Sequence, residues 1–213
     1  RVNQLSALGK KLIILSNTSS PSTSALARLP SMGFDVKDFV GAVTSGEEAS
    51  CYIKETYGCR TNENAPRKKA LWFTWKKSLK DPIDFIHLCG DVDITSDVKE
   101  ADFVIAHGTQ IVRGGSEDEE EEGCIQDLGS FMEDGDLTTS IDGILEQCKE
   151  RDLPMVCANP DFVVLLSDGS TGHMPGKIAK RYEEIGGKCT WFGKPHAPHF
   201  EACIRKLGLD KNR

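Results

Sequence analysis

The chain has 213 residues, which is enough for one large domain or two small ones with an ample core. It is 38% hydrophobic and 28% charged with a net charge of −7, and this acidic balance argues against broad binding to nucleic acids or anionic membranes. No apolar run approaches the ~18 residues that span a bilayer. The acidic net charge does not exclude a small anionic substrate, because a single lysine can make the electrostatic potential positive at one site.

The apolar periodicity of the first part predicts alternating elements: a helix over 2–8, a strand over 11–15, a helix over 22–32, a strand over 39–43 and a helix opened by 44–46. Gly9 and Gly33 are expected to end the first two helices, and a serine or threonine at 22–24 to cap the second. Glu47 and Glu48 fall in the first turn of the third helix, where the helix dipole favours acids. This pattern predicts a β-α-β unit.

Residues 60–82 combine lysines with Trp72, Phe73 and Trp75. One interpretation is a poorly packed or amphipathic connecting segment. The alternative is a nucleic-acid surface, since bases stack on aromatic rings beside lysines. One short stretch in an acidic protein favours the connecting segment.

Residues 83–158 alternate again and predict a second small α/β unit, with strands over 83–89, 103–106 and 154–158, a turn through 94–98 and a helix over 140–151. After this unit we expect a helix over 175–185, the strand over 189–192 that carries Lys194, and a last helix over 199–207. In the last helix, Phe200, Cys203, Ile204 and Leu207 are expected to face inward. The acidic run at 116–122 predicts a solvated loop. A cation site there is the minor alternative, because the run lacks the spaced glycine and asparagine of a calcium loop.

Eight cysteines are spread along the chain, and no two stand at a metal-binding spacing such as CxxC. Cys89, Cys157 and Cys189 lie in apolar runs, where a thiol behaves as a small hydrophobic group. We therefore expect a reducing compartment, either the cytoplasm or an organellar stroma or matrix. The sequence begins at Arg1 without a methionine, so a targeting signal is not assessable from it.

Two short apolar runs end in polar turns that suit a phosphate: LIIL before Ser16 and Asn17, and CTWF before Lys194. Ligands in open α/β sheets lie beyond the carboxyl ends of parallel strands, so a hydroxyl, an amide and an ammonium group at two such ends predict one anion site. The first amides of the helix after Asn17 are expected to contribute. Taken singly, each turn is equally compatible with a routine cap or a solvated lysine. Asn159-Pro160-Asp161 is a third strand-end turn and a candidate for the same cleft.

These stretches resemble the haloacid dehalogenase (HAD) superfamily, in particular class IIA, the NagD-like and 4-nitrophenylphosphatase-like hydrolases. GKKLIILSN is similar to the second motif, with Ser16 in the position that binds the phosphoryl group. WFGKP is similar to the third motif, with Lys194 as its cation. FVGAVTSGEEA resembles the passage from core to cap, HLCGDVD and EADFVIAHGT resemble cap strands, and VCANPD resembles the return to the core.

The resemblance implies an α/β fold: a partial HAD-like, Rossmann-like parallel-sheet core with an inserted α/β type II (C2) cap domain. The expected boundaries are 1–46 for the first part of the core, 47–172 for the cap and 173–213 for the second part of the core.

The resemblance also implies hydrolysis of a phosphomonoester through an aspartyl-phosphate, assisted by Mg²⁺ in the intact protein. Ser16 and Lys194 would be the catalytic residues of this chain. Asn17, Thr18, Asn159 and Asp161 would contact the substrate. The implied partners are a small phosphorylated substrate and, through the cap, a second copy of the chain.

Two HAD motifs are not found in the sequence: the DxD motif with the aspartate nucleophile, and the later motif with further metal ligands. We expect both to lie outside these 213 residues, so that the chain holds no metal site and is inactive alone. Asp91 and Asp93 of GDVD mimic these motifs but fall among the expected cap strands. The alternative function is a non-catalytic HAD-like module, acting as an interaction or structural subunit of a larger assembly. A nucleic-acid-associated protein is a more distant third.

Overall fold

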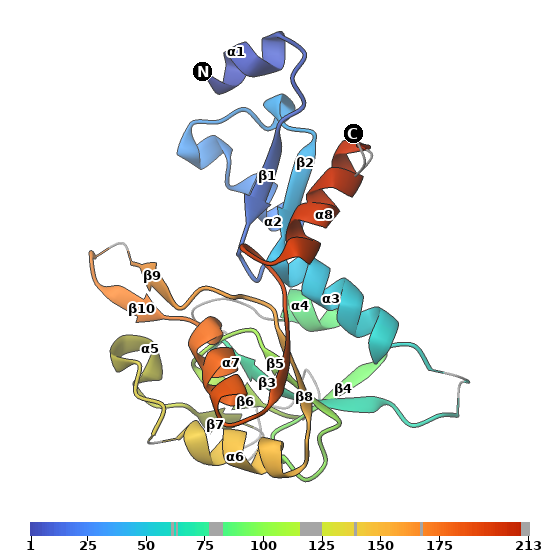
Figure 1. Ribbon diagram of the computed structural model, residues 1–213. Helices are drawn as coiled ribbons and strands as arrows, with labels where there is room; N and C mark the ends of the chain where they lie inside the picture. The colour runs from blue at the N-terminus through green and yellow to red at the C-terminus, as the bar shows by residue number, and fades with distance from the viewer. Residues whose placement is uncertain are drawn as a thin grey trace.

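The computed structural model describes residues 1–60, 62, 64–76, 83–115, 125–138, 140–166 and 168–209, without the side chains of residues 83 and 84. Its elements form two parts (Figure 1). The terminal unit, residues 1–44 and 193–209, holds both ends of the described chain. The inserted unit, residues 45–192, lies between them in sequence. The acidic run at 116–122 lies outside the described residues. No helix in the described part is long and apolar enough to cross a membrane.

The terminal unit is built on two parallel strands, β1 (Ile13–Ser16) and β2 (Gly41–Thr44), which pair Ser16 with Thr44. Its helices are α1 (Val2–Ala7), α2 (Ser22–Ala27), the 3-10 turns Pro30–Met32 and Val36–Asp38, and α8 (Ala197–Leu207). The helix expected over 22–32 is split, because Pro30 has no amide to continue the ladder and Leu29 bonds to Leu26 instead. Gly33 ends the second piece in a left-handed conformation, as predicted.

The buried face of α8 differs from the predicted one. His199 and Ala202 are buried, whereas Phe200 is 44% exposed. Apolar spacing predicts a stripe along a helix but does not fix the angle at which the helix meets its neighbours. Here α8 contacts β1 and β2, and His199 and Ala202 are the residues that it buries.

The inserted unit contains a seven-stranded mixed sheet: β3 (Lys68–Thr74), β4 (Val92–Thr95), β5 (Phe103–Ala106), β6 (Ile111–Arg113), β7 (Ile125–Asp127), β8 (Pro154–Cys157) and β11 (Lys188–Trp191). The order is β11-β8-β5-β3-β6-β7, and β4 also pairs with β3. β6 is antiparallel to both β3 and β7, whereas the other pairs are parallel. The parallel sheet was expected for the core, and the two strands of the terminal unit are parallel, whereas the sheet of the inserted unit is mixed.

Helices cover both faces of this sheet. α3 (Ser45–Thr56) and α4 (Ile83–Leu88) lie on one face, and α6 (Asp142–Glu150) and α7 (Pro175–Glu184) lie on the other (Figure 1). A short helix, α5 (Phe131–Asp134), and the hairpin of β9 (Val163–Leu165) and β10 (Thr171–His173) complete the unit. Thr44 caps α3 by accepting a hydrogen bond from the Glu47 amide at 3.3 Å, so this predicted helix start is confirmed.

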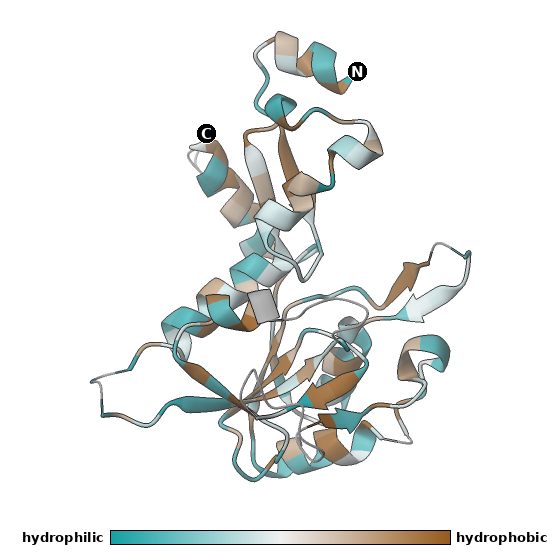
Figure 2. Cartoon of the chain, turned by 180° about the vertical axis from the view of Figure 1, so that it is seen from behind, coloured by the Kyte–Doolittle hydropathy of each residue, from teal (hydrophilic) through white to brown (hydrophobic). Residues whose placement is uncertain are grey.

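β3 lies at the centre of the sheet, which corrects the interpretation of residues 60–82 as a poorly packed segment or a nucleic-acid surface. Leu71 and Phe73 point into the core beneath α6 and α7, and Ala70 and Trp72 into the core beneath α3 and α4. All four side chains are fully buried. Figure 2 shows hydrophobic residues gathered in the strands of this sheet. An alternation of aromatic and apolar residues buried on both faces is typical of a central strand.

Residues 83–89 are not the predicted strand, because α4 occupies most of them. Phe85, Ile86 and Cys89 are buried, whereas Leu88 is 42% exposed. Burial at positions 85, 86 and 89 follows the helical period of 3.6 residues, and a short apolar run does not distinguish this from a strand by composition alone.

The sequence analysis expected the second part of the core to begin at residue 173. β11 pairs with β8 in the large sheet, and Ile178, Ala179 and Tyr182 of α7 belong to its core. Residues 173–192 therefore belong to the inserted unit, and the chain returns to the terminal unit after Phe192.

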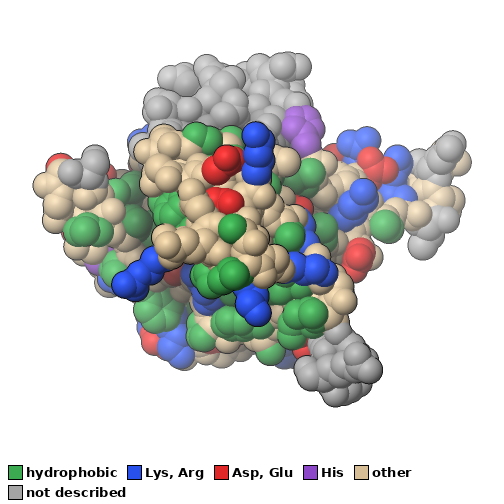
Figure 3. Space-filling view, turned by 90° about the horizontal axis from the view of Figure 1, so that it is seen from above, with side chains coloured by type: hydrophobic (Ala, Val, Ile, Leu, Met, Phe, Trp, Pro, Cys, Tyr) green, Lys and Arg blue, Asp and Glu red, His purple; other side chains and the backbone are tan. Residues whose placement is uncertain are grey.

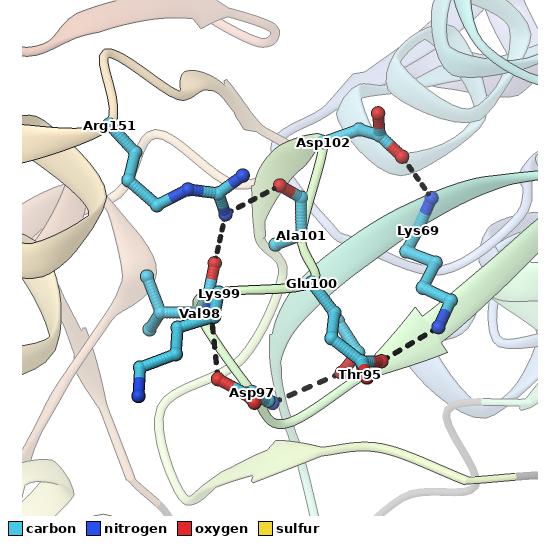
Figure 4. Close-up of polar contacts among 9 residues, drawn as sticks. All are labelled: Lys69, Thr95, Asp97, Val98, Lys99, Glu100, Ala101, Asp102 and Arg151. Carbon is cyan, nitrogen blue, oxygen red and sulfur yellow. Dashed lines mark hydrogen bonds and ion pairs between the residues drawn. The ribbon is translucent and has the colours of Figure 1, made fainter.

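The loop between β4 and β5 is fixed by a network of polar contacts, drawn in Figure 4. The guanidinium of Arg151, after α6, donates to the carbonyls of Val98 and Ala101. The Lys69 amide donates to Asp102 at 2.8 Å, and the Lys69 ammonium pairs with Glu100 at 2.7 Å. This loop is therefore fastened to both β3 and the end of α6.

Candidate functional site

A cavity of about 850 Å³ lies between the two units. Residues of the terminal unit on its wall are Ser16, Asn17, Thr18, Ser19, Ser20, Ser24, Ala27, Arg28 and Lys194. Residues of the inserted unit on its wall are Trp75, Met132, Asn159, Asp161, Val164 and Met174. All six residues that the sequence analysis singled out therefore face one cavity, although β1 and β11 belong to different sheets.

Asn17 joins the three segments that form the base of the cavity. Its side-chain amide donates to a carboxylate oxygen of Asp161 at 2.8 Å and to the carbonyl of Lys194 at 3.1 Å. Its side-chain oxygen accepts from the Lys194 amide at 2.7 Å. The Asn17 side chain thus holds both backbone polar groups of Lys194 and fixes this residue beside the end of β1.

The ammonium group of Lys194 lies at the carboxyl end of β1, where it donates to the carbonyl of Leu15 at 3.1 Å. An ammonium group has three hydrogens, so two remain for a ligand. Gly193, with φ of +106°, allows the chain to pass close to Asn17: a Cβ there would lie 2.6 Å from Pro160 and 2.9 Å from the Asn17 oxygen. A side chain at position 193 would push this loop away from the site.

The loop after β1 is shaped by its own hydroxyl groups and by the start of α3. The Ser16 hydroxyl accepts from the Thr18 amide, and the Thr18 hydroxyl accepts from the Ser20 amide, both at 3.3 Å. The Thr18 carbonyl accepts from the Gly46 amide at 3.1 Å. A Cβ at Gly46 would lie 2.1 Å from the Ser19 carbonyl oxygen, so only glycine allows this approach.

The helix amides expected to contribute to anion binding are engaged elsewhere. Glu47 of α3 accepts from the Ser22 amide at 2.6 Å, and no serine or threonine side chain caps α2. The amides of Ser24 and Ala25 donate to the Pro21 carbonyl. Because a carboxylate already occupies the start of α2, this helix end is not available to bind an anion.

Asn159 and Asp161 lie on the cavity wall, as predicted, and each has a structural partner. The Asn159 side-chain oxygen accepts from the Asp161 amide at 3.0 Å, which fixes the turn after β8. Asp161 then accepts from Asn17 across the boundary between the units. Gly176 packs against this turn, since a Cβ there would lie 2.3 Å from the Pro160 carbonyl oxygen.

Asp91 and Asp93 lie outside this cavity. The guanidinium of Arg60 contacts Asp91 at 2.8 Å, and that of Arg67 contacts Asp93 at 3.2 Å. Although they resemble a catalytic DxD motif, these two aspartates form ion pairs at the edge of the large sheet.

The sequence analysis missed His199 of α8, which is fully buried beside the site. Neither ring nitrogen has a partner at hydrogen-bonding geometry among the described residues. Burial, and next the positive charge of Lys194, lower the pKa of His199 from its ordinary value of 6.5 to about 4, while the Ser16 backbone acts weakly in the opposite direction. In the sequence, His199 stands among the apolar residues of a helix, and nothing in this pattern indicated that it would be buried beside the site.

His199 is expected to make the folded chain sensitive to acid. Its pKa is depressed in the folded state, so between pH 6.5 and pH 4 the unfolded state binds the proton while the folded state does not. Stability should therefore fall as the pH drops through this window, by a total on the order of 3 kcal/mol. Urea unfolding at half-unit pH intervals measures this loss. The variant His199→Leu should show a flatter profile than His196→Gln, and equal slopes in the two variants would contradict the assignment.

The described residues do not form a magnesium site. Asp161 is the one carboxylate among the described residues of the cavity wall, and it is already bound to Asn17. Across the described ranges, no group of three or more His, Cys, Asp and Glu side chains could hold a metal ion. Mg²⁺ requires near-octahedral oxygen ligands, which these residues do not supply.

No protein-family model and no curated protein matches the sequence. Among solved structures, the chain is similar to a haloacid dehalogenase-like hydrolase from Brucella suis 1330, with a TM-score of 0.67 and 23% identity over 100% of this chain and 66% of that one. It is also similar to the p-nitrophenyl phosphatase from Archaeoglobus fulgidus, with a TM-score of 0.60 and 23% identity over 98% of this chain and 66% of that one.

A third similar structure is a glycerol phosphate phosphatase from Mycobacterium tuberculosis in complex with calcium, with a TM-score of 0.54 and 16% identity over 96% of this chain and 50% of that one. The chain thus spans just under two thirds of the length of the first two relatives. At these identities the likeness concerns the fold. The chain therefore has the α/β fold, with a mixed central sheet, of a part of the HAD-like phosphatases, as the resemblance of its motifs predicted.

Proposed function

We propose that the cavity binds the phosphoryl group of a small phosphomonoester and that the intact protein is a HAD-type phosphatase acting through an aspartyl-phosphate. The observation that carries the proposal is the position of Lys194. In a chain of net charge −7, the backbone of Lys194 makes two hydrogen bonds to the Asn17 side chain. Its ammonium group donates to the Leu15 carbonyl and so lies at the end of β1, beside Ser16. The fold of the similar phosphatases supports the same conclusion.

The side chains at the base of the cavity match the charge of a phosphate. The two free hydrogens of Lys194 would donate to phosphoryl oxygens as charge-assisted bonds. The Ser16 hydroxyl accepts from the Thr18 amide, so its own hydrogen is available to a third oxygen. Fixed donors of this kind stabilise the charge that develops in phosphoryl transfer.

We propose that the inserted unit acts as a type II cap over this site. Trp75, Met132 and Met174 come from that unit and line the same cavity as Lys194 and the residues of α2. A cap that closes over a substrate excludes water and supplies specificity.

We further propose that the nucleophile and the ligands of Mg²⁺ are absent from the described residues. The one cavity carboxylate, Asp161, positions Asn17 and is not free to attack phosphorus. The chain alone would then bind phosphate without hydrolysing its esters. The same observation favours a second candidate, a non-catalytic HAD-like module that binds phosphate as a subunit of a larger assembly.

Titration calorimetry of the 213-residue chain with inorganic phosphate tests this proposal. Ser16→Ala should weaken binding roughly tenfold, by the usual effect of a hydrogen bond to a charged group. Thr23→Ala, on the exposed side of α2, is the matched control and should leave binding unchanged. The unmodified chain should not hydrolyse p-nitrophenyl phosphate with Mg²⁺. Robust turnover, or phosphate binding indifferent to Ser16, would overturn the proposal.

Three further features of the chain bear on its partners and surroundings. On the side seen in Figure 3, Lys and Arg side chains are interspersed with acidic and hydrophobic ones, which supports a small substrate over a nucleic acid. Val163 and Leu165 of β9 are 49% and 76% exposed and support pairing of two copies through the inserted unit. Seven cysteines in the described ranges are free thiols, which supports a reducing compartment.

A further inference from the structure

We propose that this cavity selects phosphomonoesters whose leaving group is apolar and carries a second anionic group, which binds to Arg28. The inference rests on the proposed phosphate site at Lys194. It adds a second subsite, formed by Arg28 and the apolar wall of the inserted unit. Neither part of this subsite belongs to the sequence motifs that drew attention to the cavity.

Arg28 lies on the cavity wall, and its guanidinium has no partner among the residues that the structure describes. It follows α2 directly, and its side chain is exposed. Within the described ranges, its guanidinium makes no ion pair and no hydrogen bond, whereas other guanidinium groups such as that of Arg181 pair with carboxylates at 2.9 Å. The Ser31 hydroxyl donates to the Arg28 carbonyl at 2.7 Å, so the backbone that carries this side chain is fixed.

The charges on the wall leave Arg28 available to a ligand. The charged lining residues are Arg28, Lys194 and Asp161. Asp161 is bonded to Asn17, and Lys194 is assigned to the phosphoryl group. A guanidinium binds a carboxylate or a phosphate through two parallel hydrogen bonds, which makes a second anion on the same ligand its natural partner.

The wall that belongs to the inserted unit is apolar. Trp75 and Met174 are only 5% and 9% exposed, and Val164 of β9 is 36% exposed. Gly172 of β10 brings Met132 and Val164 together, since a Cβ there would lie 3.4 Å from each. Among the described lining residues of this unit, the Asn159 side-chain oxygen and the Asp161 carboxylate have partners and the Trp75 indole nitrogen is buried, so the surface left to a leaving group is mainly hydrophobic.

The size of the cavity fits such a ligand. At about 850 Å³ it lies in the upper part of the ~300–1,000 Å³ range of small-molecule pockets. A phosphoryl group alone fills a small fraction of that space. The remainder leaves room for an apolar body in a cavity whose wall also carries Arg28.

Titration calorimetry with two non-hydrolysable probes tests the subsite on the 213-residue chain. Benzylphosphonate carries the phosphoryl mimic and the apolar body, and 4-carboxybenzylphosphonate adds a second anion. The unmodified chain should bind the carboxylated probe about tenfold more tightly, the usual factor for a charge-assisted pair. Arg28→Ala should reduce this preference to within twofold and leave the affinity for benzylphosphonate unchanged.

Further variants separate the possible failures. Lys10→Ala, which removes an exposed cation away from the cavity, controls for net charge and should keep the tenfold preference. Val164→Asn should weaken both probes by several-fold without changing their ratio. If Arg28→Ala weakens both probes equally, or neither, the subsite is wrong and the phosphate site stands. If Lys194→Ala leaves both affinities unchanged, the phosphate site itself is wrong.

Discussion

Replacing Lys194 by alanine in the intact protein is expected to lower kcat/KM for a phosphomonoester by ~10²–10³, the effect of removing one preorganised donor at a developing charge. The ammonium is fixed by the Leu15 carbonyl and, through its backbone, by Asn17, so its position does not depend on the substrate. A group that is preorganised in this way acts in the transition state, and the loss should appear mainly in kcat.

Steady-state kinetics with p-nitrophenyl phosphate measure this loss. Lys194→Arg is the informative comparison, because it keeps the charge but not the compact geometry of the ammonium, and should recover only part of the activity. Lys180→Ala, at an exposed lysine of α7 that does not line the cavity, is the matched control. Unchanged kcat/KM in Lys194→Ala would contradict the role assigned to this residue.

Replacing Phe73 by alanine is expected to lower the free energy of unfolding by ~3–5 kcal/mol, the range for aromatic-to-alanine changes in a core. Phe73 is fully buried at the centre of the large sheet, beneath α6 and α7. Its removal leaves a cavity that neighbours on the strands and on two helices would all have to fill. Urea denaturation monitored by far-UV circular dichroism measures the change.

Phe200→Ala is the control for Phe73, because Phe200 is 44% exposed and its truncation should cost less than about 1 kcal/mol. An equally small effect at Phe73 would mean that residues 68–74 are not the central strand. This comparison separates the two interpretations of the aromatic and basic segment directly, since a solvated connecting segment would tolerate both substitutions.

Local signals in the sequence were sufficient for the elements with a regular pattern and a clear end. Thr44, followed by Glu47 and Glu48, predicted the start of α3, because a threonine side chain satisfies a free amide at that point. The apolar stripe of α6, with Ile144, Leu145 and Cys148 buried, was predicted in the same way. The spacing of apolar residues depends on a single helix or strand, so it predicts that element without information on its neighbours.

The same signals failed where the environment decided the structure. Residues 60–82 contain a strand buried on both faces, and such a strand has no polar and apolar alternation to distinguish it from a disordered aromatic stretch. The run at 83–89 was too short to separate a strand from a helix. The motif strand before Lys194 was correctly predicted as a strand, but only its pairing with β8 places it in the inserted unit.

For the candidate site, the sequence by itself determined the chemical groups: a hydroxyl at Ser16, an amide at Asn17 and an ammonium at Lys194, each at the end of an apolar run. It determined them because the residue types and the strand ends are local properties of the chain. Only the tertiary structure decided how they meet, since the hydrogen bonds of Asn17 to Lys194 and to Asp161 join segments separated by 177 and 144 positions. Contacts over such separations depend on the packing of both units, and so do the burial of His199 and the place of Arg28 on the cavity wall.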